Sequence, residues 1–258
     1  MIETVALLAA GAAIGVALGA VGGGGSLLAV PALVYLGDQS VRSAQAGSLI
    51  VVIAASALGV LHYLRRGEVR WRAGLAFGLA AGAASLAASL LSRGIDPDLL
   101  LLAFAPVMAL GAVAMLTERA ALASRFRPWR HGVSARGLAE VLLAGLAVGS
   151  LTGLFGVGGG FVIVPVLVLG LGFGIAEATG TSLLVIVVGA APALAERLGS
   201  AAVEWSIVGP FAAAVLAGVL AGTGIGRRAS ARALTRGFAL VVVLTALYTG
   251  TRALLALT

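Results

Sequence analysis

Long apolar runs, bounded by charged residues, glycines or prolines, are the dominant pattern of this chain. They predict ten segments, of which eight are about 18–23 residues long, enough for a helix to cross about 30 Å of hydrocarbon. The runs do not alternate between apolar and polar residues, as the strands of a transmembrane barrel would. The predicted fold class is therefore an all-α polytopic membrane protein. The ten segments are 4–21, 26–36, 44–64, 71–91, 98–117, 136–155, 160–171, 178–196, 205–225 and 234–256.

Two of these segments, 26–36 and 160–171, are only about 11 to 12 residues long. At 1.5 Å per residue, a helix of that length covers about half of the bilayer. Each segment follows a cluster of glycines and contains one proline, Pro31 or Pro165. We expect two short broken helices, with these prolines acting as structural hinges.

The two short segments belong to an internal repeat. When the chain is aligned on itself at an offset of 134 residues, twelve positions are identical between 19–56 and 153–190. Shared apolar composition alone does not place glycines, a proline and a serine in register. The chain therefore predicts a single transmembrane domain of two repeats. Its parts are a first repeat at 1–118, a basic connection at 119–135 and a second repeat at 136–258.

Composition and charge narrow the class of protein. Hydrophobic residues make up 60% of the chain and charged residues 10%, against about a quarter charged in a soluble domain. The net charge of +7 comes from 17 arginines without a lysine, and 13 of them lie in 65–72, 119–136 and 227–236. Because cytoplasmic loops are enriched in such residues, the charge predicts orientation in the plasma membrane rather than a nucleic-acid partner. Both termini are then expected outside.

Equivalent loops of the two repeats differ in charge. The Arg-rich stretch 65–72 corresponds to 199–206, which contains Glu204 and no arginine. This difference predicts inverted-topology repeats of about five segments each. The alternative is a parallel arrangement of four and four spans, with the short segments as re-entrant hairpins.

The paired glycine clusters are the candidate substrate site. Non-helical backbone at membrane depth is tolerated only where it is buried in protein or lines a water-filled cavity, and matching interrupted segments point to a transporter's central site. The first N–H groups of a short helix, with the nearby hydroxyls and amide, can bind an anion. The alternative is that the glycines allow close helix packing and the hydroxyls bond to their own helix. The candidate residues are Gly22, Gly24, Gly25, Ser26, Gln45, Ser48, Gly156, Gly158, Gly159, Gly160, Thr179, Thr181 and Ser182.

Charged residues near these segments are a second group of candidates. Arg42, Glu140 and Glu177 are candidates for anion attraction or for coupling to an ion, with an interfacial role as the alternative. The chain has no cysteine, only two histidines and no HExxH or GxSxG motif. We therefore predict no catalytic residue, no metal site, no cofactor and no enzymatic activity.

The duplicated motif resembles a known family. The elements Gly22–Pro31 (GGGGSLLAVP) and Gly156–Pro165 (GVGGGFVIVP), with the Ala-x-x-x-Ser elements at 44–48 and 178–182, resemble the TauE/SafE family of sulfite and organosulfonate exporters. The likeness covers nearly the whole chain. The first repeat has AQAGS where the family pattern is close to ATGTS, so the two halves are expected to contribute unequal donors.

The residues and the resemblance together predict a secondary transporter in the lipid bilayer. It would export a small sulfur-containing anion, such as sulfite, thiosulfate or sulfoacetate, by alternating access around the two glycine-rich breaks. A coupling ion, H⁺ or Na⁺, and a homo-oligomer are compatible with the sequence. The alternatives are an anion channel and a non-transporting membrane assembly subunit.

Overall fold

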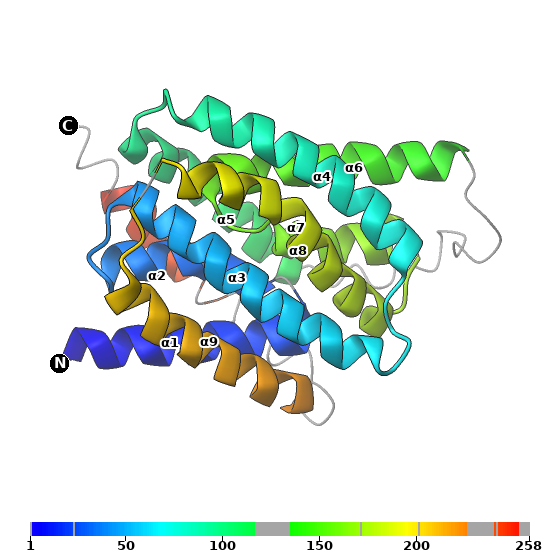
Figure 1. The fold of residues 1–258 in the computed structure, drawn as a ribbon, viewed down its shortest axis with the longest axis horizontal. Coiled ribbons are helices and arrows are strands. Elements are labelled where there is room, and N and C mark those ends of the chain that lie inside the picture. Colours follow the sequence, from blue (N-terminus) through cyan, green and yellow to red (C-terminus); the bar gives the residue numbers. More distant parts are fainter. Residues whose placement is uncertain are drawn as a thin grey trace.

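The computed structural model describes residues 2–22, 24–116, 135–170, 172–200, 202–225, 240 and 242–252, and within them every regular element is a helix, which confirms the all-α fold class. The first half contains α1 (Ile2–Val21), η1 (Gly24–Leu28), α2 (Ala29–Tyr35), α3 (Val41–Leu64), α4 (Trp71–Ser92) and α5 (Pro97–Leu116). The second half contains α6 (Ala135–Phe155), α7 (Gly160–Pro165), η4 (Val166–Gly170), α8 (Ile175–Leu198), α9 (Trp205–Ile225) and a last helix over 242–252 (Figure 1).

Within the described residues, five helices are long and apolar enough to cross a membrane, namely α3, α4, α6, α8 and α9. The sequence predicts eight such segments. Two of the others, in α1 and α5, contain the shorter apolar stretches Thr4–Ala20 and Pro97–Leu110. The predicted segment 234–256 and the connection 119–135 lie largely outside the described residues, although Ala135 already belongs to α6.

Both short segments are helical, as expected, but neither is α-helical throughout. In the first half a 3₁₀-helix begins inside the glycine cluster at Gly24, and the α-helix begins only at Ala29. Pro31 lies in the first turn of α2, where a missing N–H costs no hydrogen bond. In the second half α7 ends at Pro165, and the chain continues as a π-helix to Gly170. Because proline has no N–H donor, the α-helical ladder cannot continue unchanged through it.

Large apolar side chains cover the outside of the bundle, whereas hydroxyl side chains lie inside it. Exposed leucines include Leu79, Leu91, Leu110, Leu143 and Leu247. The fully buried polar residues include Ser48, Ser56, Ser85, Thr181 and Ser182. The interior also contains many buried apolar side chains, so it is the apolar outside that distinguishes this bundle from a protein in water and suits a hydrocarbon solvent.

Helices of one half pack against helices of the other half. The first helix of each half packs against the fourth helix of the other, so that α1 contacts α9 and α6 contacts α4, while α3 and α8 contact each other. A Cβ atom at Gly15 of α1 would lie 2.0 Å from the Val215 carbonyl oxygen, and one at Gly149 of α6 would lie 2.1 Å from that of Ala81. Each of these pairs of positions is related by the offset of 134 residues. These glycines therefore permit close helix packing, in the same way in both halves.

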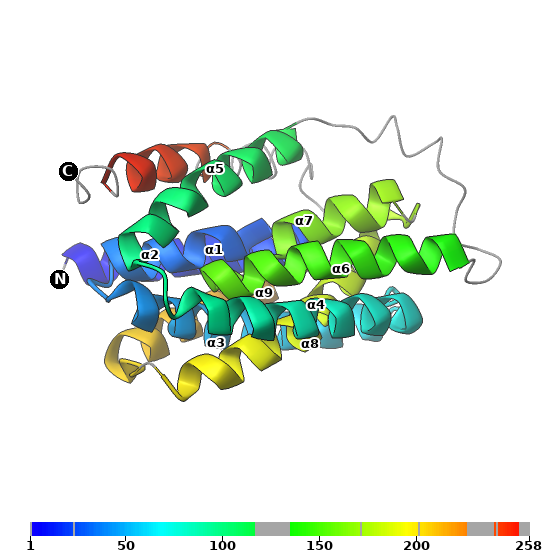
Figure 2. The same cartoon turned by 90° about the horizontal axis from the view of Figure 1, so that it is seen from above.

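Equivalent helices of the two halves run in opposite directions. In Figure 1, α1 and α3 run from left to right, and α6 and α8 run from right to left. The start of α1 and the loops at 36–40, 93–96 and 199–200 lie at what we call the N-terminal end. The loop at 65–70, the start of α6 and the end of α9 lie at the far end, and Figure 2 shows the same arrangement from above. The inverted topology in the membrane remains a prediction that this geometry supports.

Candidate functional site

Each glycine break lies against the third helix of the other half. A Cβ atom at Gly22, where φ is +75°, would lie 2.8 Å from the Ser182 Oγ atom and 3.0 Å from the Thr179 Cγ2 atom of α8. A Cβ atom at Gly156, where φ is +69°, would lie 2.7 Å from the Gln45 Cβ atom of α3. Both the positive φ and the lack of space require glycine at these two positions. The structure thus brings together predicted site residues that are far apart in the sequence.

The two breaks also meet each other between α3 and α8. A Cβ atom at Gly158 would lie 2.8 Å from the Val52 Cγ1 atom, 3.6 Å from the Ile186 Cγ2 atom and 3.8 Å from the Ser26 Cβ atom of the first break. Ser26 and Val52 are fully buried. We call the residues that meet around these breaks the central cluster. Its members are Gly22, Ser26, Gln45, Gly156, Gly158, Thr179 and Ser182. Ser48 is counted with them because it lies one helical turn from both Gln45 and Val52, on the same face of α3.

Not every predicted glycine faces the central cluster. A Cβ atom at Gly25 would lie 2.4 Å from the Ile14 carbonyl oxygen of α1, and one at Gly159 would lie 2.5 Å from the Val148 side chain of α6. These two glycines pack their own half's break onto its first helix. Gly24 begins η1, and the buried Gly160 begins α7.

The predicted hydroxyl groups differ in what they bond to. Ser48 is fully buried, and its Oγ atom has no hydrogen-bond partner among the described residues. The Ser182 Oγ atom donates to the Thr179 carbonyl oxygen of its own helix at 2.8 Å, as the alternative interpretation expects. The Thr181 Oγ1 atom accepts a hydrogen bond from the Arg70 backbone N–H at 3.0 Å, and so holds the loop at the far end. Of these hydroxyls, that of Ser48 is therefore available for a ligand.

The three charged candidates do not come together. Arg42 is exposed at the N-terminal end and donates to the Arg93 carbonyl oxygen at 3.0 Å. Glu177 forms an ion pair with Arg70 at the far end. Glu140 is exposed on α6, 16 residues before Gly156, which at 1.5 Å per residue is about 24 Å along the helix.

A buried arginine that the sequence analysis did not single out lies beside the second break. Arg197, near the end of α8, is only 6% exposed. Its guanidinium donates to the Gly153 carbonyl oxygen at 2.5 Å and to the Gln45 Oε1 atom at 2.5 Å, with a longer bond of 3.3 Å to the Ser92 Oγ atom. Since Gln45 also contacts Gly156, Arg197 is hydrogen-bonded directly to a member of the central cluster.

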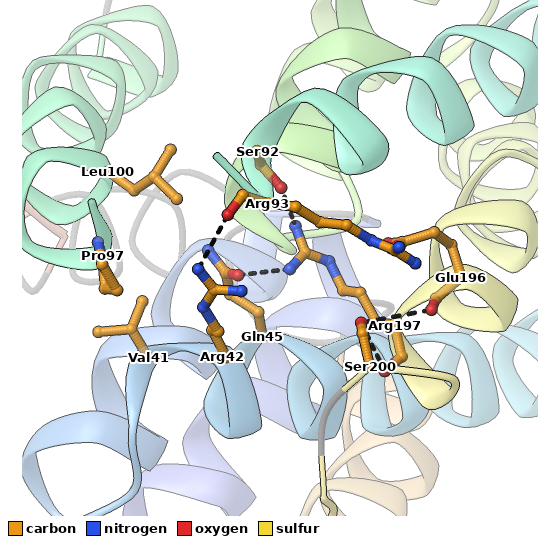
Figure 3. A pocket seen from close by; sticks show the side chains of 10 residues that line it. All are labelled: Val41, Arg42, Gln45, Ser92, Arg93, Pro97, Leu100, Glu196, Arg197 and Ser200. Carbon is orange, nitrogen blue, oxygen red and sulfur yellow. Dashed lines mark hydrogen bonds and ion pairs between the residues drawn. The ribbon is translucent and has the colours of Figure 1, made fainter. Parts of the chain in front are cut away.

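Arg197 lines a pocket at the N-terminal end, which we call the arginine pocket (Figure 3). Arg42, Arg93 and Arg197 surround it, and Glu196 is the one acidic residue among the described residues that line it. The Glu196 carboxylate is bound by Arg93 and by the Ser89 hydroxyl. The described residues that line it are Val41, Arg42, Gln45, Ser92, Arg93, Pro97, Leu100, Glu196, Arg197 and Ser200.

A signal for this pocket exists in the sequence. Four of the 17 arginines lie outside the three Arg-rich stretches, namely Arg42, Arg93, Arg197 and Arg252. Three of these four line the arginine pocket. The exceptions to the charge pattern, rather than the pattern itself, mark the site.

The chain is similar to proteins that are named as probable membrane transporters. The family model for the sulfite exporter TauE/SafE matches residues 7–249. A probable membrane transporter protein of Xylella fastidiosa strain 9a5c is 30% identical over 244 residues, which cover 93% of this chain and 92% of that protein. A probable membrane transporter protein of Methanocaldococcus jannaschii is 27% identical over 167 residues, which cover 62% of this chain and 60% of that protein.

No solved structure matches the chain. The family match extends over both glycine breaks, α3, α8 and all the arginines that line the pocket. On this match and the near-complete overlap with the Xylella protein, the chain belongs to the TauE/SafE sulfite exporter family and is a multi-pass membrane transporter.

Proposed function

We propose that this chain is a secondary transporter that exports a small sulfur-containing anion, such as sulfite, thiosulfate or an organosulfonate like sulfoacetate. The observation that carries the proposal is the central cluster, in which two glycine breaks meet buried polar side chains of the opposite halves. Irregular backbone inside a membrane protein is tolerated where it lines a binding cavity. Membership in the sulfite exporter family supports the class of substrate.

The chemistry of the central cluster suits weak binding of an anion. The Ser48 hydroxyl is buried without a partner among the described residues, and an unsatisfied buried hydroxyl costs about 1–3 kcal/mol unless a ligand completes it. Glycine leaves backbone N–H groups uncovered by a side chain, so that oxygens can approach them. Because the donors in the cluster are neutral, we expect an anion to bind weakly enough to be released.

The packing between the two halves suggests how alternating access could work. Because α1 packs on α9 and α6 on α4, the parts that move need not coincide with the two repeats, 1–118 and 136–258. The breaks join these pairs to α3 and α8, so a motion of one part against the other passes through the central cluster. The opposite directions of equivalent helices support an inverted repeat.

The proposed orientation places both termini outside and the stretches 65–72, 119–136 and 227–236 in the cytoplasm. The positions of the described residues next to these stretches support it, because 65–70, the start of α6 and the end of α9 lie at the same end of the molecule (Figure 1). A gradient of H⁺ or Na⁺ would drive the export.

Flux in proteoliposomes tests the proposal. We expect saturable uptake of sulfite, thiosulfate or sulfoacetate that responds to a gradient of H⁺ or Na⁺. Gly158→Leu should abolish flux in a folded protein, because a Cβ atom there already lies 2.8 Å from Val52. Gly209→Leu is the matched control, since no atom lies within 4 Å of a Cβ at that position. Absence of flux for all three anions would overturn the proposal. Flux that does not saturate with anion concentration and does not respond to a gradient of H⁺ or Na⁺ would indicate a channel.

A further inference from the structure

The arginine pocket contains more positive than negative charge. In the described part of the chain, three arginines line it against a single carboxylate, that of Glu196, which Arg93 and Ser89 already bind. The ion pairs found among the described residues are Arg70–Glu177 and Arg93–Glu196, and neither includes Arg197. All the hydrogen bonds that Arg197 donates go to neutral oxygens.

A buried cation in this situation requires compensation. Removing a charged group from water costs several kcal/mol, which neutral acceptors offset only in part. The Arg197 Nε atom is also buried without a hydrogen-bond partner among the described residues. An anion in the pocket would supply the missing negative charge, and a guanidinium fork suits a ligand with two or more oxygens.

The position of these arginines in the membrane points to the same conclusion. Arginine is depleted from the outer side of membrane proteins, and the N-terminal end is the proposed outer side. Arg42, Arg93 and Arg197 nevertheless gather there around one pocket (Figure 3). Arginines on the outer side do not contribute to the orientation of the chain in the membrane. We therefore expect them to have a function within the pocket itself.

We propose that the arginine pocket is a binding site for a small oxyanion, such as sulfite, sulfate or a sulfonate group, bound by Arg197 and Arg42. Glu196 acts there as an internal competitor, because it neutralises Arg93 in the absence of the ligand. The site rests on the proposed function, since its ligand belongs to the class of the transported anion. Gln45, which bonds to Arg197 and contacts Gly156, links the pocket to the central cluster.

Among the described residues of the far end, no arginine occupies the place that Arg197 has at the N-terminal end. The residue that matches Arg197 at the offset of 134 is Tyr63. Its hydroxyl donates to the Gly19 carbonyl oxygen at 3.1 Å, as Arg197 donates to that of the equivalent Gly153. The phenol fills the same structural place without a charge. The anion site is therefore expected at the N-terminal end alone.

Calorimetric titration of the purified full-length protein in detergent tests this site, with sodium sulfite and sodium sulfate as ligands in a gluconate buffer. One charge-assisted hydrogen bond contributes about 1.5–3 kcal/mol, so Arg197→Gln should weaken binding about tenfold or more. Arg42→Gln should weaken it about threefold, because this side chain is exposed and screened. Arg252→Gln is the control at the same end, and we expect its affinity to match that of the wild type.

The decisive variant is Glu196→Gln, which keeps the shape of the side chain and removes its charge. Freed from this competitor, Arg93 should strengthen anion binding severalfold. A purely structural role of the pocket predicts no such gain. If Arg197→Gln does not fold, Arg42→Gln and Glu196→Gln still decide the question, because unchanged affinity in both would overturn the site.

Parallel flux measurements separate this inference from the proposed function. A wild-type protein that transports sulfite while the pocket variants bind it unchanged, or that transports without detectable binding, would overturn the anion pocket and leave the transporter in place. A wild-type protein that neither binds nor transports these anions would overturn both. Binding that weakens in Arg42→Gln and strengthens in Glu196→Gln supports the site.

Discussion

Tyr63 and Arg197 occupy equivalent places at opposite ends of the molecule. They make the same kind of hydrogen bond, one with a neutral phenol and the other with a charged guanidinium. Each donates a hydrogen bond to the carbonyl oxygen of an equivalent glycine, Gly19 or Gly153, near the end of the first helix of its half. The last carbonyls of a helix have no partner within it, so a side chain that donates there stabilises the break. The difference teaches that the repeated scaffold requires a donor at this place but does not fix its charge.

The packing glycines show the opposite case, in which both halves retain the same residue. Gly15 against Val215 and Gly149 against Ala81 are equivalent contacts of nearly equal closeness. Here the backbones themselves approach each other, and no side chain larger than a hydrogen atom fits. Helix packing therefore keeps the two halves alike, whereas residues around the breaks are free to differ.

The largest expected effect comes from breaking what the halves share. Gly15→Ala and Gly149→Ala should each destabilise the protein by about 1–3 kcal/mol, because the added methyl group would overlap a carbonyl oxygen. Gly209→Ala should be neutral or stabilising by up to about 1 kcal/mol, since its Cβ meets open space and alanine favours the helix. Thermal unfolding followed by size-exclusion measures all three. A large loss in one half only would contradict equivalent packing.

The next effect separates the two equivalent donors. Arg197→Gln should raise the KM for sulfite about tenfold or more, because it removes a charge-assisted contact to the anion. Tyr63→Phe should lower thermal stability by about 1 kcal/mol, the value of one neutral hydrogen bond, and leave the KM unchanged. Sulfite flux per folded protein in proteoliposomes measures both. Equal KM values in the two variants would show that the ends do not differ in anion recognition.

A smaller effect distinguishes the paired serines. Ser48→Ala should leave stability unchanged or raise it, because the Oγ atom has no partner among the described residues, yet weaken sulfite binding about threefold or more. Ser182→Ala should weaken binding less, since its hydroxyl hydrogen is already donated to the Thr179 carbonyl. Calorimetry and thermal unfolding give the two quantities. A stability loss without an affinity change in Ser48→Ala would make this serine purely structural.

The smallest effect concerns the ion pair at the far end. The side chains of Arg70 and Glu177 are 56% and 31% exposed, so Glu177→Gln should change the free energy of unfolding by about 1 kcal/mol or less. Transport should keep its dependence on the H⁺ gradient in this variant. Loss of that dependence, read from flux at matched gradients, would identify Glu177 as a coupling residue.

Much of the fold was predictable because it depends on composition and register. Apolar runs gave the positions of the long helices to within a few residues, as for α4, predicted at 71–91 and found at Trp71–Ser92. The repeat marked Gly22 and Gly156. Both have positive φ angles, which glycine adopts more easily than any other residue type. The sequence did not show that each break contacts the other half, since that depends on which helices of the two halves pack against each other.

Arg197 was missed for a physical reason. At the end of a long helix, after Glu196 and two residues before Gly199, an arginine in the sequence is typical of an interfacial residue that extends to water. Only the packing of α8 against the end of α6 turns its side chain inward, to the Gly153 carbonyl. Likewise, the sequence suggested equal roles for Gly24, Gly25 and Gly159, but Gly25 and Gly159 pack against the first helix of their own half.

The exchange of Tyr63 for Arg197 also has an electrical consequence. An anion that crosses without a compensating charge carries current, and a potential of 100 mV changes its energy by about 2.3 kcal/mol. Two identical inverted halves would present the same energy profile from either side and conduct equally at voltages of either sign. A fixed guanidinium at the N-terminal end adds to the asymmetry that the differently charged loops of the two repeats already create, so we expect the current to rectify.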